Sequence, residues 1–127
     1  MLRACHELLK PGGRLAFATI YIKPGVGERE YRRAARARGR GAASRHAVTD
    51  LLRAAGFVDV RETDVTAAFE RTARALLETS RDLHDRLRRE WGDDALNQSQ
   101  DHWRKTLAVV EEGIVRRGIF SARRPPR

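Results

Sequence analysis

A nearly continuous apolar run from Leu15 to Ile22 constrains the fold of this chain more than any other feature. The run contains β-branched and aromatic residues, and it is bounded by Gly13 before it and by Pro24-Gly25 after it. Runs of this length and composition are typical of a strand covered on both faces, as in the centre of a parallel sheet. Alternation predicts a small-residue face with room for a helix (Ala16, Ala18, Ile20 and Ile22) and an opposite face of Leu15, Phe17, Thr19 and Tyr21.

A helical pattern flanks this strand on each side. Residues 1–10 carry apolar residues at helical spacing and stop at Pro11-Gly12-Gly13; the apolar face is Leu2, Cys5, Leu8 and Leu9. Residues 23–43, rich in glycine and arginine, are predicted to be a loop or a short mobile helix, and a solvated connection is favoured over a binding lid. Ser44 is then a candidate N-cap for a helix with the buried stripe Val48, Leu51, Leu52 and Ala55.

That helix is predicted to end at Gly56, where a left-handed residue is favoured, with Phe57 folding back onto Leu52. Alternating apolar and charged residues then predict a more exposed strand at about 58–65. The segment 14–65 is therefore strand, helix, strand, and such a unit is usually a right-handed parallel crossover in an α/β sheet.

Two apolar stripes at helical spacing predict two longer helices within residues 67–117. The first stripe runs from Phe69 to Trp91 and is interrupted by Gly92-Asp93-Asp94, and the second runs from Trp103 to Ile114. A short strand at about Gly118 to Arg123 closes the pattern before Pro125-Pro126.

Composition narrows the class of protein. The 127 residues suffice for one domain, and no apolar run reaches the length of a membrane-spanning helix. Without a signal peptide and with a single cysteine, Cys5, a cytoplasmic location is expected by default. The net charge of +9 comes mostly from arginines spread along the chain, which argues against a dedicated nucleic-acid surface.

No group of side chains predicts a catalytic centre or a metal site. The four histidines, His6, His46, His84 and His102, are scattered without metal-ligand spacing. Asp93-Asp94 and Glu111-Glu112 are typical of solvated helix charges rather than of an acid and base pair.

Three segments in order carry a resemblance to a known family. Glu7-Leu-Leu-Lys-Pro-Gly-Gly-Arg-Leu-Ala-Phe-Ala-Thr19 resembles the segment of class I S-adenosylmethionine-dependent methyltransferases that ends a helix and enters the fifth strand. Leu51-Leu-Arg-Ala-Ala-Gly-Phe-Val-Asp-Val60 resembles the next helix and the sixth strand, and Arg117-Gly-Ile-Phe-Ser-Ala-Arg-Arg-Pro125 resembles the last strand. Together they cover roughly half of the chain.

The resemblance implies that residues 1–127 are the C-terminal half of one Rossmann-like α/β domain, with the last, antiparallel strand between the other two. Residues 67–117 would then be a two-helix insertion that covers a substrate pocket. The cofactor would be S-adenosylmethionine and the partner a small-molecule methyl acceptor. Thr19 and Tyr21, at the carboxyl end of the strand, and Trp103, from the insertion, are the candidate residues near substrate, although helical spacing also fits Trp103 as a core residue.

The chain departs from the family in one respect. The family holds its cofactor on a glycine-rich turn after the first strand and on an acidic residue that ends the second, and no segment here matches either, so no cofactor-binding residue is assigned. We therefore expect a fragment that is inactive without a missing N-terminal half and that self-associates through an exposed apolar sheet edge.

Two alternatives remain open from the sequence. The chain is alternatively a non-enzymatic module that completes a partner's sheet, which a neighbouring reading frame for the glycine-rich half would support. It is alternatively a basic nucleic-acid binder that uses residues 29–45, which a steep loss of affinity with salt would support.

Overall fold

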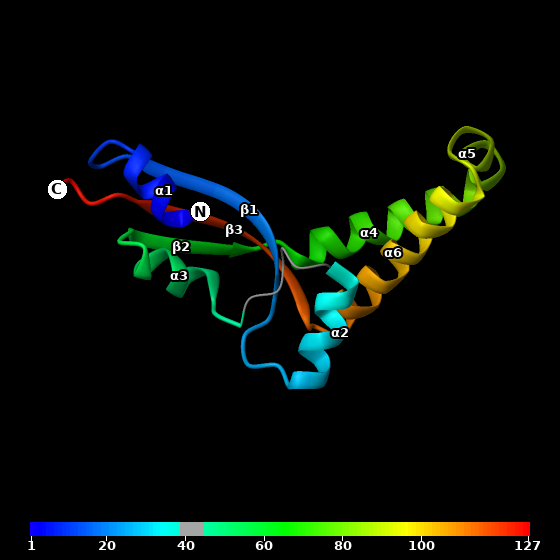
Figure 1. The fold of residues 1–127 in the computed structure, drawn as a ribbon, viewed down its shortest axis with the longest axis horizontal. Coiled ribbons are helices and arrows are strands. Elements are labelled where there is room, and N and C mark those ends of the chain that lie inside the picture. The colour runs from blue at the N-terminus through cyan, green and yellow to red at the C-terminus, as the bar shows by residue number, and fades with distance from the viewer. Residues whose placement is uncertain (39–44) are drawn as a thin grey trace.

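A three-stranded sheet at one end of the molecule joins a group of helices at the other (Figure 1). The structure, a computed structural model, describes residues 1–38 and 45–127. Its elements in chain order are α1 (Leu2–Leu8), β1 (Arg14–Ile22), α2 (Glu28–Arg38), α3 (Val48–Ala54), β2 (Val58–Asp64), α4 (Thr66–Asp82), α5 (His84–Trp91), α6 (Asp93–Glu111) and β3 (Val115–Arg123).

The sheet has the order β1-β3-β2, and β3 is antiparallel to both neighbours. β1 and β2 are therefore parallel to each other, as the sequence predicts for an α/β crossover, and the last strand lies between them, as the resemblance implies. β3 begins at Val115 rather than near Gly118, because Val115 pairs with Ile22 and both side chains are buried at the junction with the helices.

Helices α1 and α3 cover one face of the sheet. Their apolar side chains form a core with β1 and β3, built on Leu52, Phe57, Phe120 and Ala122. α3 ends as predicted, because Gly56 has a φ of +96° while Phe57 N–H donates to the Leu52 carbonyl (3.1 Å) and Gly56 N–H to that of Arg53 (3.0 Å). Leu8 was expected on the apolar face of α1, but it is 86% exposed at the helix end.

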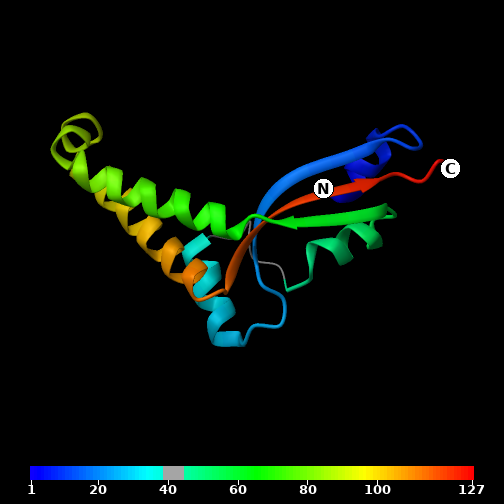
Figure 2. The ribbon, with the colours of Figure 1, turned by 180° about the vertical axis from the view of Figure 1, so that it is seen from behind.

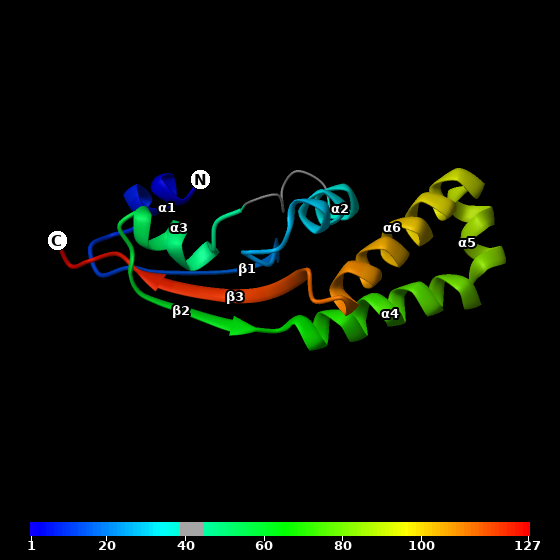
Figure 3. The same cartoon turned by 90° about the horizontal axis from the view of Figure 1, so that it is seen from below.

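The prediction that β1 is covered on both faces holds only at the carboxyl end of the strand. α1 and α3 pack on the face of the larger residues, Leu15, Phe17 and Tyr21, and not on the small-residue face (Figure 3). Ala16 and Ala18 on the other face are exposed. Further along the same face, Ile20 and Ile22 pack into one core with Ala34 and Ala37 of α2, so this face of β1 is uncovered only at Ala16 and Ala18.

The second core lies among the helices, where α4 and α6 run side by side and α5 lies at the far tip (Figure 2). Its buried residues are Ile22, Ala34, Ala37, Phe69, Val109, Val110, Ile114 and Val115. The first predicted helix of the insertion is divided in two, because Leu83 (φ −97°, ψ 21°) leaves the helical conformation and separates α4 from α5. No helix in the two described ranges is both long and apolar enough to cross a membrane.

The segment expected to be a solvated connection contains a packed helix. Ala34 and Ala37 of α2 are buried against the helical core, so this helix is part of the fold. Ser44, the predicted N-cap, lies outside the described residues; α3 begins at Val48 and follows Ala47.

Candidate functional site

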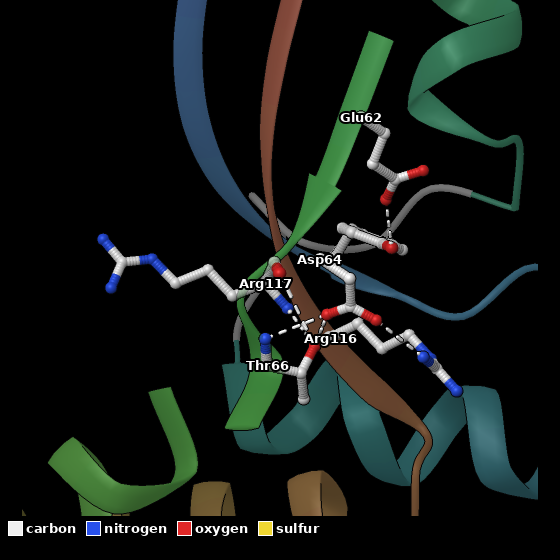
Figure 4. Close-up of polar contacts among 6 residues, drawn as sticks. Glu62, Asp64, Thr66, Arg116 and Arg117 are labelled. Atoms are coloured by element: carbon white, nitrogen blue, oxygen red, sulfur yellow. Dashed lines mark hydrogen bonds and ion pairs between the residues drawn. The ribbon is translucent and has the colours of Figure 1, made fainter. Parts of the chain in front are cut away.

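The carboxyl ends of β1 and β2 lie where the sheet meets the helices, and five polar side chains gather there. We call this set the junction cluster: Tyr21, Glu62, Asp64, Thr66 and Arg116. Figure 4 shows Glu62 and Asp64 leaving the same strand beside Thr66 and Arg116. The strand register explains the gathering, because Glu62 is opposite Phe120 and Asp64 is opposite Gly118, on the sheet face that also carries Tyr21.

Tyr21 and Glu62 are joined across the central strand. The Tyr21 hydroxyl donates a hydrogen bond of 2.5 Å to Glu62 Oε1. Gly118 lies beneath this contact, since a Cβ built there would be 2.8 Å from Phe120 Cε2 and 3.1 Å from Glu62 Oε1. Burial raises the pKa of the Tyr21 phenol well above its usual value, and the bond to Glu62 and the negative charges of Glu62 and Asp64 raise it further. Tyr21 is therefore a protonated donor.

Asp64 fixes the start of α4. Its Oδ1 accepts from the Thr66 backbone N–H (2.9 Å) and from the Thr66 hydroxyl (2.5 Å), while Oδ2 accepts from Arg116 Nη1 (2.9 Å). The hydrogen bonds from Thr66, followed by that from Arg116, lower the pKa of the Asp64 carboxyl. Thr66 in turn accepts from the Arg117 N–H at 3.0 Å, so the start of the helix and the central strand are tied together.

An apolar groove of about 510 Å³ runs beside β1 on the face that carries α1 and α3. Its lining residues are Met1, Leu2, Arg3, Phe17, Thr19, Ile20, Tyr21, Val48, Leu51, Ala54 and Ala55. Thr19 and Tyr21 thus line one groove, and Tyr21 also belongs to the junction cluster. The third candidate, Trp103, is not in the groove: it is half-buried on α6 against the helical core, with its ring centroid 5.3 Å from that of His102.

Glu62, Asp64 and Arg116 are site residues that sequence reasoning missed. The available signal was the pair of carboxylates two residues apart at the end of a predicted strand, which places both on one face. Their partners depend on the register with β3, which the sequence pattern does not give.

The described residues do not fit the cofactor that the fold family implies. Among them no cluster of histidine, cysteine, aspartate and glutamate could hold a metal ion. A ribose is held by a carboxylate that accepts from its hydroxyls, yet the Asp64 carboxylate at the end of β2 already accepts three hydrogen bonds, two from Thr66 and one from Arg116. The groove beside β1 is lined mainly by apolar side chains, which suits neither a ribose nor an amino-acid moiety.

Neither protein-family models nor curated protein sequences match this chain. Solved structures do. Phosphoethanolamine N-methyltransferase 2 of Haemonchus contortus, in complex with phosphomonomethylethanolamine and S-adenosylhomocysteine, matches 98% of this chain with a TM-score of 0.82 at 15% identity, over 29% of its own length. A putative sarcosine dimethylglycine methyltransferase from Galdieria sulphuraria matches 99% of this chain with a TM-score of 0.83 at 11% identity, over 47% of its length.

A third similar structure is the cyclase SpnF, which matches 98% of this chain with a TM-score of 0.58 at 22% identity, over 43% of its length. At such identities the likeness shows the fold alone. This chain spans less than half the length of each of these proteins. Its sheet order, helices and likeness to the two methyltransferases together show a partial Rossmann-like α/β fold that fits the C-terminal half of a class I methyltransferase domain.

Proposed function

We propose that this chain is the substrate-side part of an S-adenosylmethionine-dependent methyltransferase that acts on a small molecule. The observation that carries the proposal is the sheet order β1-β3-β2 with its appended helices, which superposes over 98% of the chain on an N-methyltransferase. The helices α4, α5 and α6 would form a cover beside the carboxyl ends of the strands, where ligands of open α/β sheets bind.

Tyr21 and Thr19 are the residues that we expect to face the methyl acceptor. Methyl transfer depends largely on holding the nucleophile in line with the methyl group, so orienting groups matter more than acid and base catalysis. Because burial and Glu62 raise its pKa, the Tyr21 phenol stays protonated and acts as an orienting group. The phenol proton is donated to Glu62, so the phenol oxygen can accept a hydrogen bond from a hydroxyl or amine of the methyl-accepting substrate. We assign Trp103 a packing role on α6 rather than a contact with the substrate.

S-adenosylmethionine is the cofactor in this proposal, and polypeptide outside this chain supplies most of its site. Two features support placing the cofactor site mostly outside this chain: the groove beside β1 is apolar, and the Asp64 carboxylate is already hydrogen-bonded. The chain is also similar to a cyclase, and one fold can carry different reactions, so methyl transfer is itself part of what we propose.

The test is nuclear magnetic resonance of the isotope-labelled chain titrated with sarcosine and with phosphoethanolamine as probes. We expect the amide signals of Thr19 and Tyr21 to shift in a saturable manner, and we expect Y21F to weaken the binding. The matched control is Y31F, since Tyr31 lies on α2 and does not line the groove. Shifts confined to other elements, or equal binding by Y21F and the wild type, would contradict the assignment of the acceptor side.

A further inference from the structure

A cavity of about 520 Å³ lies at the amino end of β1. It is on the face of the sheet opposite to the one that α1 and α3 cover (Figure 3). Three arginines from three different strands line it: Arg14 of β1, Arg61 of β2 and Arg123 of β3. The one acid in its lining is Asp59. Three guanidinium charges against one carboxylate leave an excess of two positive charges around this cavity.

The strand register gives the cavity a floor of small side chains between long cationic ones. Ala16, Ser121 and Arg61 form one row across the sheet, and Arg14 is directly opposite Arg123 in β3. The short side chains of Ala16 and Ser121 leave room above the strands. Like charges directly opposite each other in an antiparallel pair are destabilising, and an anion bound between Arg14 and Arg123 would remove that cost.

Asp59 orients one of the three arginines. β2 shifts its register between Val58 and Arg61, and Asp59 has a φ of 52°, the one positive φ outside glycine in the described ranges. Its Oδ2 lies 2.7 Å from Arg123 Nη2. Bulges redirect side chains and are frequent next to active sites, and this one lies beside an ion pair that holds Arg123. Arg14 and Arg61 form no ion pair within residues 1–38 and 45–127, so their charges remain available to a ligand.

We propose that this cavity binds a small phosphate compound, either inorganic phosphate or a phosphate monoester. Such a group carries about 1.5 to 2 negative charges at pH 7, which matches the excess of two positive charges better than a carboxylate does. Guanidinium groups bind phosphate oxygens through paired N–H donors, and the Ser121 hydroxyl can supply another donor. A cavity of this volume is typical of sites for small molecules and leaves room for the organic part of an ester.

This site does not depend on the proposed function. The junction cluster lies at the carboxyl ends of β1 and β2 and on the other face of the sheet, so the two sites have no residue in common. Binding of phosphate is read from the amide signals of Arg61 and Ser121, and binding of a methyl acceptor from those of Thr19 and Tyr21. Failure of one proposal is therefore distinguishable from failure of the other.

The first test is nuclear magnetic resonance of the isotope-labelled chain titrated with inorganic phosphate and with glycerol 3-phosphate at constant ionic strength. We expect saturable shifts of the Arg61 and Ser121 amides with both probes, and none with acetate at the same concentrations. Tighter binding of glycerol 3-phosphate would identify the ligand as a phosphate monoester, and equal binding would identify it as phosphate itself.

Arginine variants separate this site from the general positive charge of the chain. We expect R14Q and R61Q each to raise the dissociation constant for phosphate about threefold, and the double variant at least about tenfold, because a single exposed ion pair contributes modestly. R71Q is the matched control: it removes the same charge from an exposed position of α4 outside the cavity and should leave the affinity nearly unchanged. Circular dichroism checks that all variants fold.

The second test is thermal unfolding with and without phosphate. Phosphate should raise the melting temperature of the wild type more than that of R14Q/R61Q, because a ligand stabilises the state that binds it. Phosphate also stabilises proteins in general, so the difference between the two proteins is the readout. The proposal is overturned by an absence of saturable shifts at Arg61 and Ser121, by equal shifts with acetate, or by equal loss of affinity in R71Q and R61Q. Tighter binding of duplex DNA by the same residues, weakening steeply with salt, would also overturn it.

Discussion

The Tyr21 hydroxyl donates a 2.5 Å hydrogen bond to Glu62 Oε1, and this contact joins the two outer strands of the sheet across the central one. It passes over Gly118, the position in β3 where an added side chain would meet Phe120 and Glu62. Tyr21 is thereby tied to β2, the strand that ends at Asp64, and the Asp64 carboxylate bonds Thr66 at the start of α4. The junction between sheet and helices is held by these two groups of hydrogen bonds, which both include a carboxylate of β2.

Removing the Tyr21 phenol should change how stability depends on pH. The pKa of Tyr21 in the folded chain lies above the 10.0 of an unperturbed phenol, so its contribution to folding is complete below pH 10.0 and is lost as the pH rises above it. Urea unfolding should show wild-type stability falling more steeply above pH 10.0 than that of Y21F. At neutral pH Y21F should lose about 1 kcal/mol. Y31F is the control, and equal slopes for Y21F and the wild type would contradict the assignment.

Replacing Gly118 by alanine should loosen the junction. A Cβ at this position would be 2.8 Å from Phe120 Cε2 and 2.9 Å from its Cζ, so the buried ring must move. Crowding of a packed core costs about 1–3 kcal/mol, and we expect a loss in that range for G118A in urea unfolding. The S121A variant on the exposed side of the same strand is the control and should be nearly neutral. Wild-type stability for G118A would show that the ring has room to move.

His102 should make the packing of α2 on α6 sensitive to acid. Arg38 Nη1 lies 3.3 Å from His102 Nε2 and also donates to the hydroxyl of the buried Thr106 at 3.3 Å, so α2 is fixed to α6 while the imidazole is neutral. Burial, and then the charge of Arg38, lower the pKa of His102 below 6.5. The folded state therefore resists protonation, and stability should decrease as the pH falls through 6.5. H102Q should flatten this decrease in urea unfolding, whereas H84Q on α5 should retain it.

Two glycines that end helices in the same way separate local strain from crowding. Gly56 and Gly113 both have positive φ angles, 96° and 77°, and each donates its N–H to the carbonyl three residues before it, Arg53 and Val110. A Cβ at Gly113 would meet nothing within 4 Å, whereas one at Gly56 would lie 3.1 Å from His6 Nε2. Both alanine variants should lose about 1 kcal/mol from the positive φ angle, and G56A should lose more because His6 must shift. Equal losses in thermal or urea unfolding would mean that moving His6 has no energetic cost.

Local signals in the sequence were enough to predict most of the sheet. The turn at Pro11-Gly12-Gly13 and the end of α3 at Gly56 are determined by backbone conformations that glycine adopts easily, so they can be recognised without tertiary information. The position of β3 between β1 and β2 followed from the resemblance and is confirmed by the register.

What the sequence could not predict depends on contacts between distant segments. A helix was expected over Ala16 and Ala18, which are exposed. The alternation of side chains divides a strand into two faces, but it does not show on which face a helix packs. A short helix was one expectation for the segment that contains α2, but its packing was missed because only two buried alanines, Ala34 and Ala37, mark its packed side among exposed arginines. Glu62 was missed because its partner Tyr21 lies 41 residues away in the chain.

The most direct test of the proposed function is isothermal titration of S-adenosylmethionine into the purified chain, with S-adenosylhomocysteine as a second ligand. We expect no saturable heat for either compound, because the Asp64 carboxylate at the end of β2 is bonded to Thr66 and Arg116 and the groove beside β1 is lined mainly by apolar side chains. Saturable binding in the micromolar range would contradict the division of the site, since this chain would then hold the cofactor with its own residues.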